Sequence, residues 1–189
     1  MNKNNSKLFI FTGPSGVGKG TILEGFFKKA KNITYSISAT TRAPRAGEKD
    51  GVHYFFKTKE EFENLIKKDC FLEYALYSGN YYGTNKEFVE TKLNEGISVL
   101  LEIELQGALQ VMKNCPDAVS IFIKPPSFEE LEHRLRGRKS EDEATILKRL
   151  DRAKTELQYQ NKFNYIIEND TVENAINQLY KIYNKVISK

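Results

Sequence analysis

The residues best suited to chemistry in this chain form a glycine-rich segment that contains one lysine. It reads Gly-Pro-Ser-Gly-Val-Gly-Lys-Gly-Thr and directly follows the apolar run Leu8–Phe11. Glycines at spacings of three and two residues let backbone N–H groups turn toward an anion, and Lys19 adds a mobile cation for the outer phosphates. The segment therefore predicts a phosphate-binding loop made of Gly13, Pro14, Ser15, Gly16, Val17, Gly18, Lys19, Gly20 and Thr21.

The order of elements around this loop supports that interpretation. An apolar strand precedes it, and residues 21–30 place apolar side chains on one helical face, so the loop ends at a helix N-terminus that favours anions. A glycine-rich turn that binds nothing would need neither so many glycines nor the lysine. Because Gly20 follows Lys19, the hydroxyl comes one place later than usual, at Thr21, and direct Mg²⁺ coordination by Thr21 is left open.

A second anion site is predicted from residues 40–48. Arg42 and Arg45 flank a proline there and are followed by a glycine, a turn-rich setting in which they cannot pack as core. The hydroxyl of Tyr54, in a predicted β segment over residues 52–56, is able to join them at one anion. Residues 79–84, Gly-Asn-Tyr-Tyr-Gly-Thr, are expected to form a tight, ligand-facing turn. Solvated arginines and half-buried packing tyrosines are the plainer alternatives.

Three glutamates lie at positions that suggest a role in ligand binding, one inside an apolar strand and two at the end of another. Glu73 lies within the apolar strand-like run 71–77, where it needs a partner, either a ligand or a structural cation. Glu102 and Glu104 lie at the C-terminal end of the apolar run 97–103, which resembles a central parallel strand. Ligands bind at that end of open α/β sheets, although acids solvated at a strand end would look the same.

The composition is that of an ordinary globular protein. The chain has 189 residues, 40% apolar and 29% charged, with a net charge of +4, which suits a small anionic ligand and does not demand nucleic acid. No run approaches the roughly 18 apolar residues of a membrane span, and the polar N-terminus lacks the roughly seven apolar residues of a secretory signal. We therefore expect a cytoplasmic protein. Two distant cysteines and two histidines argue against a zinc or histidine metal site.

Strand-like and helix-like segments alternate along the chain. Strands are expected near residues 33–38, 71–77, 97–103, 118–124 and 165–167. A helix over 58–68 begins with a capping box formed by Thr58 and Glu61, and Ser127 caps another helix that becomes strongly basic near residue 134. The alternation predicts an α/β fold with a mainly parallel central sheet.

Taken with the phosphate loop, four further motifs resemble the guanylate kinase family in order and spacing. They are residues 40–48, 79–84, 102–107 and 134–138, and the resemblance covers about residues 7–187. It implies a three-layer P-loop fold with a core (7–35, 97–133 and 146–187), a GMP-binding insertion (36–96) and a mobile lid (134–145). The implied reaction is ATP plus GMP giving ADP plus GDP with Mg²⁺, with neither nucleic acid nor membrane as a partner. Whether dGMP also serves as an acceptor is left open. The oligomeric state is left open.

The resemblance also implies a role for individual residues. Ser38, Glu73, Thr84 and Glu104 surround guanine; Arg42, Arg45, Tyr54 and Tyr82 hold the GMP phosphate; Arg134, Arg138 and Arg149 contact the reacting phosphates with Lys19; Asn169 lies near adenine; and Thr21 and Glu102 serve the metal, directly or through water. The family pattern has Asp-Ile-Asp where this chain has Glu102-Ile103-Glu104, so both carboxylates are one methylene longer.

Two other functions remain as alternatives. Related domains in scaffold proteins bind peptides without catalysis, and other P-loop kinases use a different small phosphorylated acceptor. Lys19 with its glycines, the paired arginines and the basic segment argue against a binding module, and Glu73 with the tyrosines argues against another acceptor.

Overall fold

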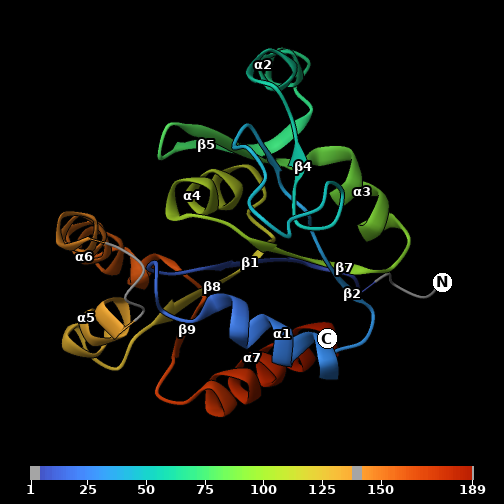
Figure 1. Cartoon of the computed structure of the whole chain (residues 1–189). Helices are drawn as coiled ribbons and strands as arrows, with labels where there is room; N and C mark the ends of the chain where they lie inside the picture. The colour runs from blue at the N-terminus through green and yellow to red at the C-terminus, as the bar shows by residue number, and fades with distance from the viewer. Residues whose placement is uncertain (1–4, 138–141, 189) are drawn as a thin grey trace. The chain divides into compact units, whose positions relative to one another are not determined.

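The computed structural model describes residues 5–137 and 142–188, in which strands and helices alternate (Figure 1). The strands are β1 (Leu8–Thr12), β2 (Ile33–Tyr35), β3 (Ala39–Thr40), β4 (Phe55–Phe56), β5 (Phe71–Tyr77), β6 (Asn80–Asn85), β7 (Ser98–Glu102), β8 (Val119–Lys124) and β9 (Tyr165–Glu168). The helices are α1 (Lys19–Lys29), α2 (Lys59–Lys67), α3 (Lys86–Asn94), α4 (Leu105–Asn114), α5 (Phe128–Gly137), α6 (Glu143–Leu157) and α7 (Val172–Ile187), with a 3-10 helix η1 (Gln160–Lys162).

The larger sheet confirms the predicted α/β class. Its strand order is β2-β7-β1-β8-β9, and the β2/β7 and β8/β9 pairs are parallel. All five residues of β1 are buried, and Val99, Leu100 and Leu101 of β7 are at most 1% exposed. Strands covered on both faces explain why these segments are apolar throughout rather than alternating.

The smaller sheet, of order β4-β3-β6-β5, contains a hairpin that the sequence did not predict. Ser78 and Gly79 both have positive φ (47° and 78°), as a two-residue turn of type I′ requires, and they join β5 to an antiparallel β6. The tight turn expected over residues 79–84 is therefore wrong beyond Gly79. Strand predictions over 33–38 and 52–56 were too long, because β2 ends at Tyr35 and β4 begins at Phe55.

The chain divides into two compact units. The first, Met1–Ile10 with Asn32–Ala118, contains the smaller sheet; the second, Phe11–Lys31 with Val119–Lys189, contains α1 and the elements from β8 to α7. None of the described helices is both long and apolar enough to cross a bilayer.

In the first unit, helices cover both faces of the smaller sheet (Figure 1). On one face, Phe62 of α2 stacks on Phe71 of β5, with ring centroids 4.4 Å apart. The predicted capping box of α2 is confirmed, since Thr58 accepts from the Glu61 N–H while the Glu61 carboxylate accepts from the Thr58 N–H. On the other face α4 packs against β5, and Gly107 lies beside Glu73.

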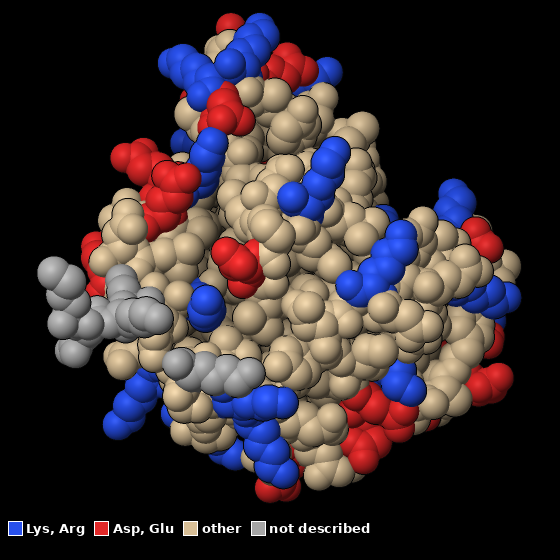
Figure 2. Space-filling model, turned by 180° about the vertical axis from the view of Figure 1, so that it is seen from behind, with Lys and Arg blue, Asp and Glu red and all other residues tan. Residues whose placement is uncertain are grey.

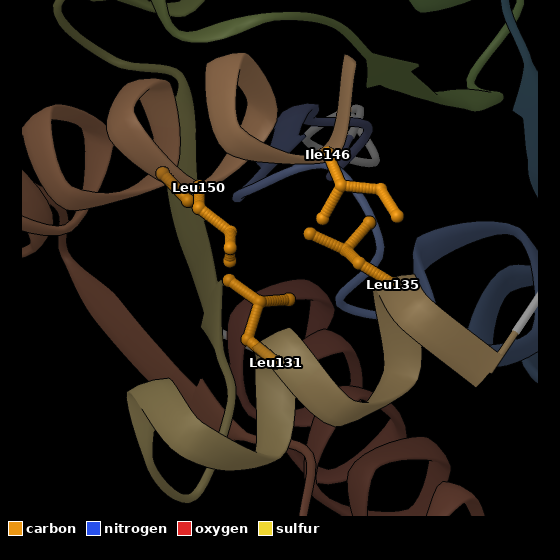
Figure 3. Close-up of a cluster of buried hydrophobic side chains, with 5 residues drawn as sticks. Leu131, Leu135, Ile146 and Leu150 are labelled. Atoms are coloured by element: carbon orange, nitrogen blue, oxygen red, sulfur yellow. The ribbon is translucent and has the colours of Figure 1, made fainter. Parts of the chain in front are cut away.

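In the second unit, α1 packs on α7, and α5 packs on α6. Phe26 of α1 meets the ring of Tyr183 edge-on, and the Tyr183 hydroxyl donates to the carbonyl of Lys31. Figure 3 shows Leu131 and Leu135 of α5 pointing at Leu150 and Ile146 of α6. Ala153 of α6 belongs to the same buried cluster. The limits predicted for core, insertion and lid remain predictions.

Candidate functional site

The phosphate loop joins β1 to α1 in the second unit. Gly18 is the residue before α1 and has a φ of 97°, a conformation that costs other residues strain. A β-carbon on Gly13 would lie 2.2 Å from the backbone oxygen of Ile123 in β8. These two positions require glycine for backbone reasons, one for its conformation and one for a close approach.

The ammonium of Lys19 lies over the loop itself. Its Nζ donates to the carbonyl oxygens of Gly13 (2.6 Å) and Pro14 (3.2 Å). The side chain is only partly buried. A cation held by loop carbonyls at the N-terminus of α1 can exchange those oxygens for phosphate oxygens with little movement.

Asn169, directly after β9, holds the phosphate loop by a side-chain hydrogen bond. Its Nδ2 donates to the carbonyl of Val17 at 2.7 Å, its side chain is 3% exposed, and its Oδ1 is buried without a hydrogen-bond partner among the described residues. A β-carbon on Gly18 would lie 2.7 Å from Nδ2. Asn169 thus positions the loop, while its predicted place near adenine stays a prediction.

Two of the three predicted arginines, Arg134 and Arg149, are described in the second unit. Arg134 of α5 donates through Nη2 to the carbonyl of Asn169 (3.1 Å) and through Nε to Glu130 (2.7 Å), so it belongs to the same cluster as the loop. Arg149 is a partly exposed residue of α6. Arg138 lies outside the described residues. Thr21 is exposed in the first turn of α1.

In the first unit, Arg42 is held between a carboxylate and an aromatic ring. Its Nη2 donates to both carboxylate oxygens of Glu48 (2.8 and 2.9 Å), and its guanidinium lies 5.3 Å from the ring centroid of Tyr54. The backbone N–H of Arg45 donates to the same carboxylate (2.7 Å). These hydrogen bonds, that of Arg42 first, hold the pKa of Glu48 below its ordinary value. The structure thus brings the Arg42 side chain and the Arg45 backbone to one group.

Tyr82 completes this cluster. Its ring lies 6.0 Å from that of Tyr54, edge-on. Burial, followed by the neighbouring Tyr82, raises the pKa of Tyr54, so its hydroxyl remains a donor at neutral pH. Arg42, Tyr54 and Tyr82, three residues predicted to bind one anion, therefore lie together.

Glu73 and Thr84 form the polar centre of the smaller sheet. They are cross-strand partners in β5 and β6, and Thr84 Oγ1 donates to Glu73 Oε1 at 2.7 Å. Glu73 is 5% exposed. Burial raises its pKa to about 7, partly opposed by hydrogen bonds from Thr84. Among the described residues, no lysine or arginine forms an ion pair with this carboxylate.

The remaining predicted residues of the first unit lie around the ends of strands. Tyr35 donates its hydroxyl to Glu102 Oε2 at 3.2 Å, and burial together with the Glu102 charge raises the pKa of Tyr35. Glu104 is the residue before α4, where its carbonyl accepts from Ala108 N. Ser38 lies beside β3 and its carbonyl accepts from Phe55 N at 2.9 Å.

Sequence reasoning missed two residues that shape these clusters. Glu48 was quoted in the 40–48 motif but given no role, although it orders both arginine positions. Gly107 gives Glu73 its space, since a β-carbon there would lie 2.3 Å from Glu73 Oε2. A carboxylate three residues after an arginine in a turn is a detectable signal for Glu48, whereas nothing local in the sequence links Gly107 to Glu73.

Charges of both signs are spread over the surface. On the face shown in Figure 2, described Lys and Arg side chains are interspersed with acidic and neutral ones. Among the described residues, no three His, Cys, Asp or Glu side chains lie close enough to hold a metal ion. Mg²⁺ in phosphoryl-transfer sites is bound mainly by substrate phosphates and water with one or two protein groups, so the residues present fit an ion that arrives with ATP.

A strand, a glycine loop with its lysine and a helix, set in a mainly parallel sheet, define an α/β protein of the phosphate-loop nucleotide-binding class. The family model for guanylate kinase matches residues 5–186. The chain therefore belongs to the guanylate kinase family, and its enzyme class is nucleoside monophosphate kinase.

Individual relatives agree over nearly the full chain. A guanylate kinase from Synechococcus sp. (strain JA-3-3Ab) is 51% identical over 92% of this chain and 80% of its own length. A guanylate kinase from Halalkalibacterium halodurans is 48% identical over 96% and 89%. The crystal structure of guanylate kinase from Anaplasma phagocytophilum has a TM-score of 0.79 at 32% identity, covering 97% of this chain and 87% of that one.

Proposed function

We propose that this chain transfers the γ-phosphoryl group of ATP to GMP, giving ADP and GDP. The observation that carries the choice of acceptor is the buried Glu73 carboxylate, held by Thr84 in the same unit as the Arg42–Tyr54–Tyr82 cluster. Membership of the guanylate kinase family supports it.

Glu73 suits guanine because of hydrogen-bond complementarity. Guanine presents adjacent N1–H and amino donors, which one carboxylate accepts together, whereas adenine presents a bare N1 lone pair there. AMP would leave the carboxylate both desolvated and repelled, and a buried polar group left unpaired discriminates strongly. Ser38, Thr84 and Glu104 complete the proposed base site, in which dGMP is an expected further acceptor.

Arg42, Arg45, Tyr54 and Tyr82 are proposed to bind the acceptor phosphate. A guanidinium offers a planar set of donors to phosphate oxygens, and the two hydroxyls add neutral donors. Glu48 holds Arg42 in one orientation, which reduces the ordering that binding requires.

The phosphate loop with Lys19 is proposed to bind the ATP phosphates. Arg134 and Arg149 are proposed to act on the transferring group. Arg138 is given the same role from the sequence alone. Thr21 and Glu102 would serve the Mg²⁺ that accompanies ATP, which neutralises phosphate charge when bound. Phosphoryl transfer needs alignment and charge stabilisation more than covalent help. The acceptor oxygen of GMP is already ionised, so no general base is assigned.

The test is release of ADP, measured with purified protein, ATP and Mg²⁺ against GMP, dGMP, AMP, CMP and UMP. GMP should be the preferred acceptor, and Glu73→Gln should lower the ratio of GMP to AMP turnover. Faster turnover of another monophosphate would overturn the choice of acceptor. An absence of turnover with all five, together with peptide binding, would favour the binding-module alternative.

A further inference from the structure

A cavity of about 490 Å³ lies in the first unit, between α2 and the smaller sheet. Its apolar lining is Ala39 of β3, Phe55 of β4, Leu65 of α2 and Phe71 of β5. Ala39 and Phe71 are 5% and 8% exposed, so they form a floor, while Phe55 is 38% exposed at the rim. The volume lies within the range of about 300–1,000 Å³ typical of small-molecule sites.

This cavity is separate from the proposed GMP site. The registers Phe71↔Asn85 and Glu73↔Thr84 leave one extra residue in β5, a β-bulge. Strict alternation would point Phe71 and Glu73 to the same face, and the bulge instead lets Phe71 stack on α2 while Glu73 packs against Gly107 of α4. The cavity therefore lies on the face of the sheet opposite the buried carboxylate.

The polar lining of the cavity offers donors. Lys57 and Lys68 line it, and the positive charge of Lys57 also acts on Glu61, the acid of the same lining. The acid in the lining, Glu61, already accepts from Thr58 N at 2.7 Å, and hydrogen bonds from Thr58 lower its pKa. Asn85 uses its Oδ1 to accept from Phe88 N, so its amide N–H groups are what it can turn to a ligand.

A lining with an apolar floor, two lysines and one carboxylate already held by Thr58 is complementary to one chemical class. We propose that this cavity binds a small organic carboxylate with a flat apolar body, placing the body on Leu65 and Phe71 and the carboxylate between Lys57 and Lys68. Positive charge in the lining of an apolar pocket gives orientation and specificity, while the floor removes apolar surface from water.

Binding there would reach the acceptor site through two strands. The cavity contacts Ala39, whose neighbour Thr40 accepts from the backbone N–H of Arg42 at 3.2 Å. It also contacts Phe71, two residues before Glu73 in β5. We therefore expect occupancy to change the affinity for GMP, a consequence that rests on the proposed function, whereas binding itself does not.

Binding is tested on the full ¹⁵N-labelled chain with 2-naphthoate as probe and 2-naphthamide as its uncharged match. Saturable shifts of the amide signals of Leu65 and Phe71 are expected for naphthoate. Lys57→Met/Lys68→Met should raise its Kd at least about tenfold, because each lysine contributes a charge-assisted contact. Lys67→Met, an exposed lysine of α2 outside the cavity lining, should leave the Kd unchanged.

Equal binding of the amide or the absence of a saturable shift would overturn the site. Shifts confined to Arg42 and Tyr82, with none at Leu65 and Phe71, would also overturn it, because the anion would then occupy the acceptor site. Coupling is tested separately, as a change in KM for GMP with naphthoate in the wild type that the double variant lacks. A wild type that binds naphthoate but phosphorylates no GMP would refute the proposed function and leave the site standing. Binding with an unchanged KM would refute the coupling.

Discussion

The absence of a side chain on Gly107 makes room for one oxygen of Glu73: a β-carbon on Gly107 would lie 2.3 Å from Oε2 and 2.9 Å from Cδ of the carboxyl group. The other oxygen accepts from Thr84 at 2.7 Å. The carboxyl group is therefore positioned from two further elements, the partner strand β6 of the same hairpin and the helix α4. Its orientation does not depend on β5 alone.

Replacing Gly107 with alanine should displace the Glu73 carboxylate. We expect KM for GMP to rise about tenfold, a loss typical of one weakened hydrogen-bonding contact, with KM for ATP unchanged. Alanine gains helix propensity over glycine, but the packing strain outweighs this gain. We expect the net effect to lower the free energy of unfolding by about 1–2 kcal/mol. Steady-state kinetics and urea unfolding measure the two effects. Gly137→Ala is the stability control, because among the described residues a β-carbon there would meet no atom within 4 Å apart from its chain neighbours and the backbone of its own helix. Equal KM values for wild type and Gly107→Ala would refute the contact.

The raised pKa of Glu73 should make stability depend on pH. Burial moves the carboxyl from its ordinary value to about 7 in the folded chain, so the folded state binds the proton more tightly than the unfolded state does. This contribution to stability is complete below the unfolded pKa and is lost as pH rises through about 7, a change of about 3 kcal/mol between about pH 4.5 and pH 8.

Urea unfolding of wild type and Glu73→Gln across that range measures the effect as a difference. As pH rises, the free energy of unfolding of Glu73→Gln should increase relative to that of the wild type. Because guanine donors favour the ionised carboxylate, GMP binding near pH 7 should also release a proton, detectable by calorimetry in two buffers of different ionisation heat. A pH-independent difference between the two proteins would show that Glu73 titrates normally.

Lys19→Ala should remove activity and keep the fold. The ammonium bonds only to the loop carbonyls of Gly13 and Pro14 in the described chain, so its loss should change the free energy of unfolding by less than about 2 kcal/mol. Losing a cation that meets the transferring phosphate should lower kcat by about 10² to 10³. Lys28→Ala is a matched control on the same helix, where the ammonium pairs with Glu24 in solvent. Near-native kcat in Lys19→Ala would contradict the role.

Asn169→Leu should weaken ATP binding without affecting GMP. The substitution removes the donor to the Val17 carbonyl while filling a similar volume, so the loop loses the bond that fixes it. We expect KM for ATP to rise about tenfold, because an unpaired buried carbonyl costs about 1–3 kcal/mol and the loop relaxes to avoid that cost. Steady-state kinetics with each substrate varied in turn provides the measurement. A rise in KM for GMP of the same size would indicate general disruption rather than a loop effect.

The fold was predictable wherever local pattern and tertiary environment agree. β1 and β7 are apolar because both faces are buried, and α2 carries its own start signal in Thr58 and Glu61. The phosphate loop was predictable for the same reason, since its glycines and Lys19 act through their own backbone. The assignments of guanine and phosphate ligands came from resemblance, and those roles stay predictions.

Prediction failed where partners distant in sequence decide the structure. Residues 79–84 contain two glycines and an asparagine, which indicate a turn, but Tyr81 and Tyr82 pair with Leu76 and Ala75 across the hairpin and form a strand. The contact between Gly107 and Glu73 and the hydrogen bond from Asn169 to Val17 join residues 34 and 152 positions apart in the printed sequence. Such contacts leave no periodicity for a local pattern to detect.

The bulge in β5 predicts which changes of length this hairpin tolerates. Leu72 is the extra residue between the two registers, so its deletion would leave Phe71 and Glu73 as consecutive residues of a regular strand, each still on its own face. Deleting Tyr74 instead would turn every following side chain of β5 over, exposing Ala75 and burying the exposed Leu76 position. Deleting Leu72 should therefore leave each remaining side chain of β5 on its present face. Deleting Tyr74, two positions further on, should move the side chains of the second half of β5 to the opposite face.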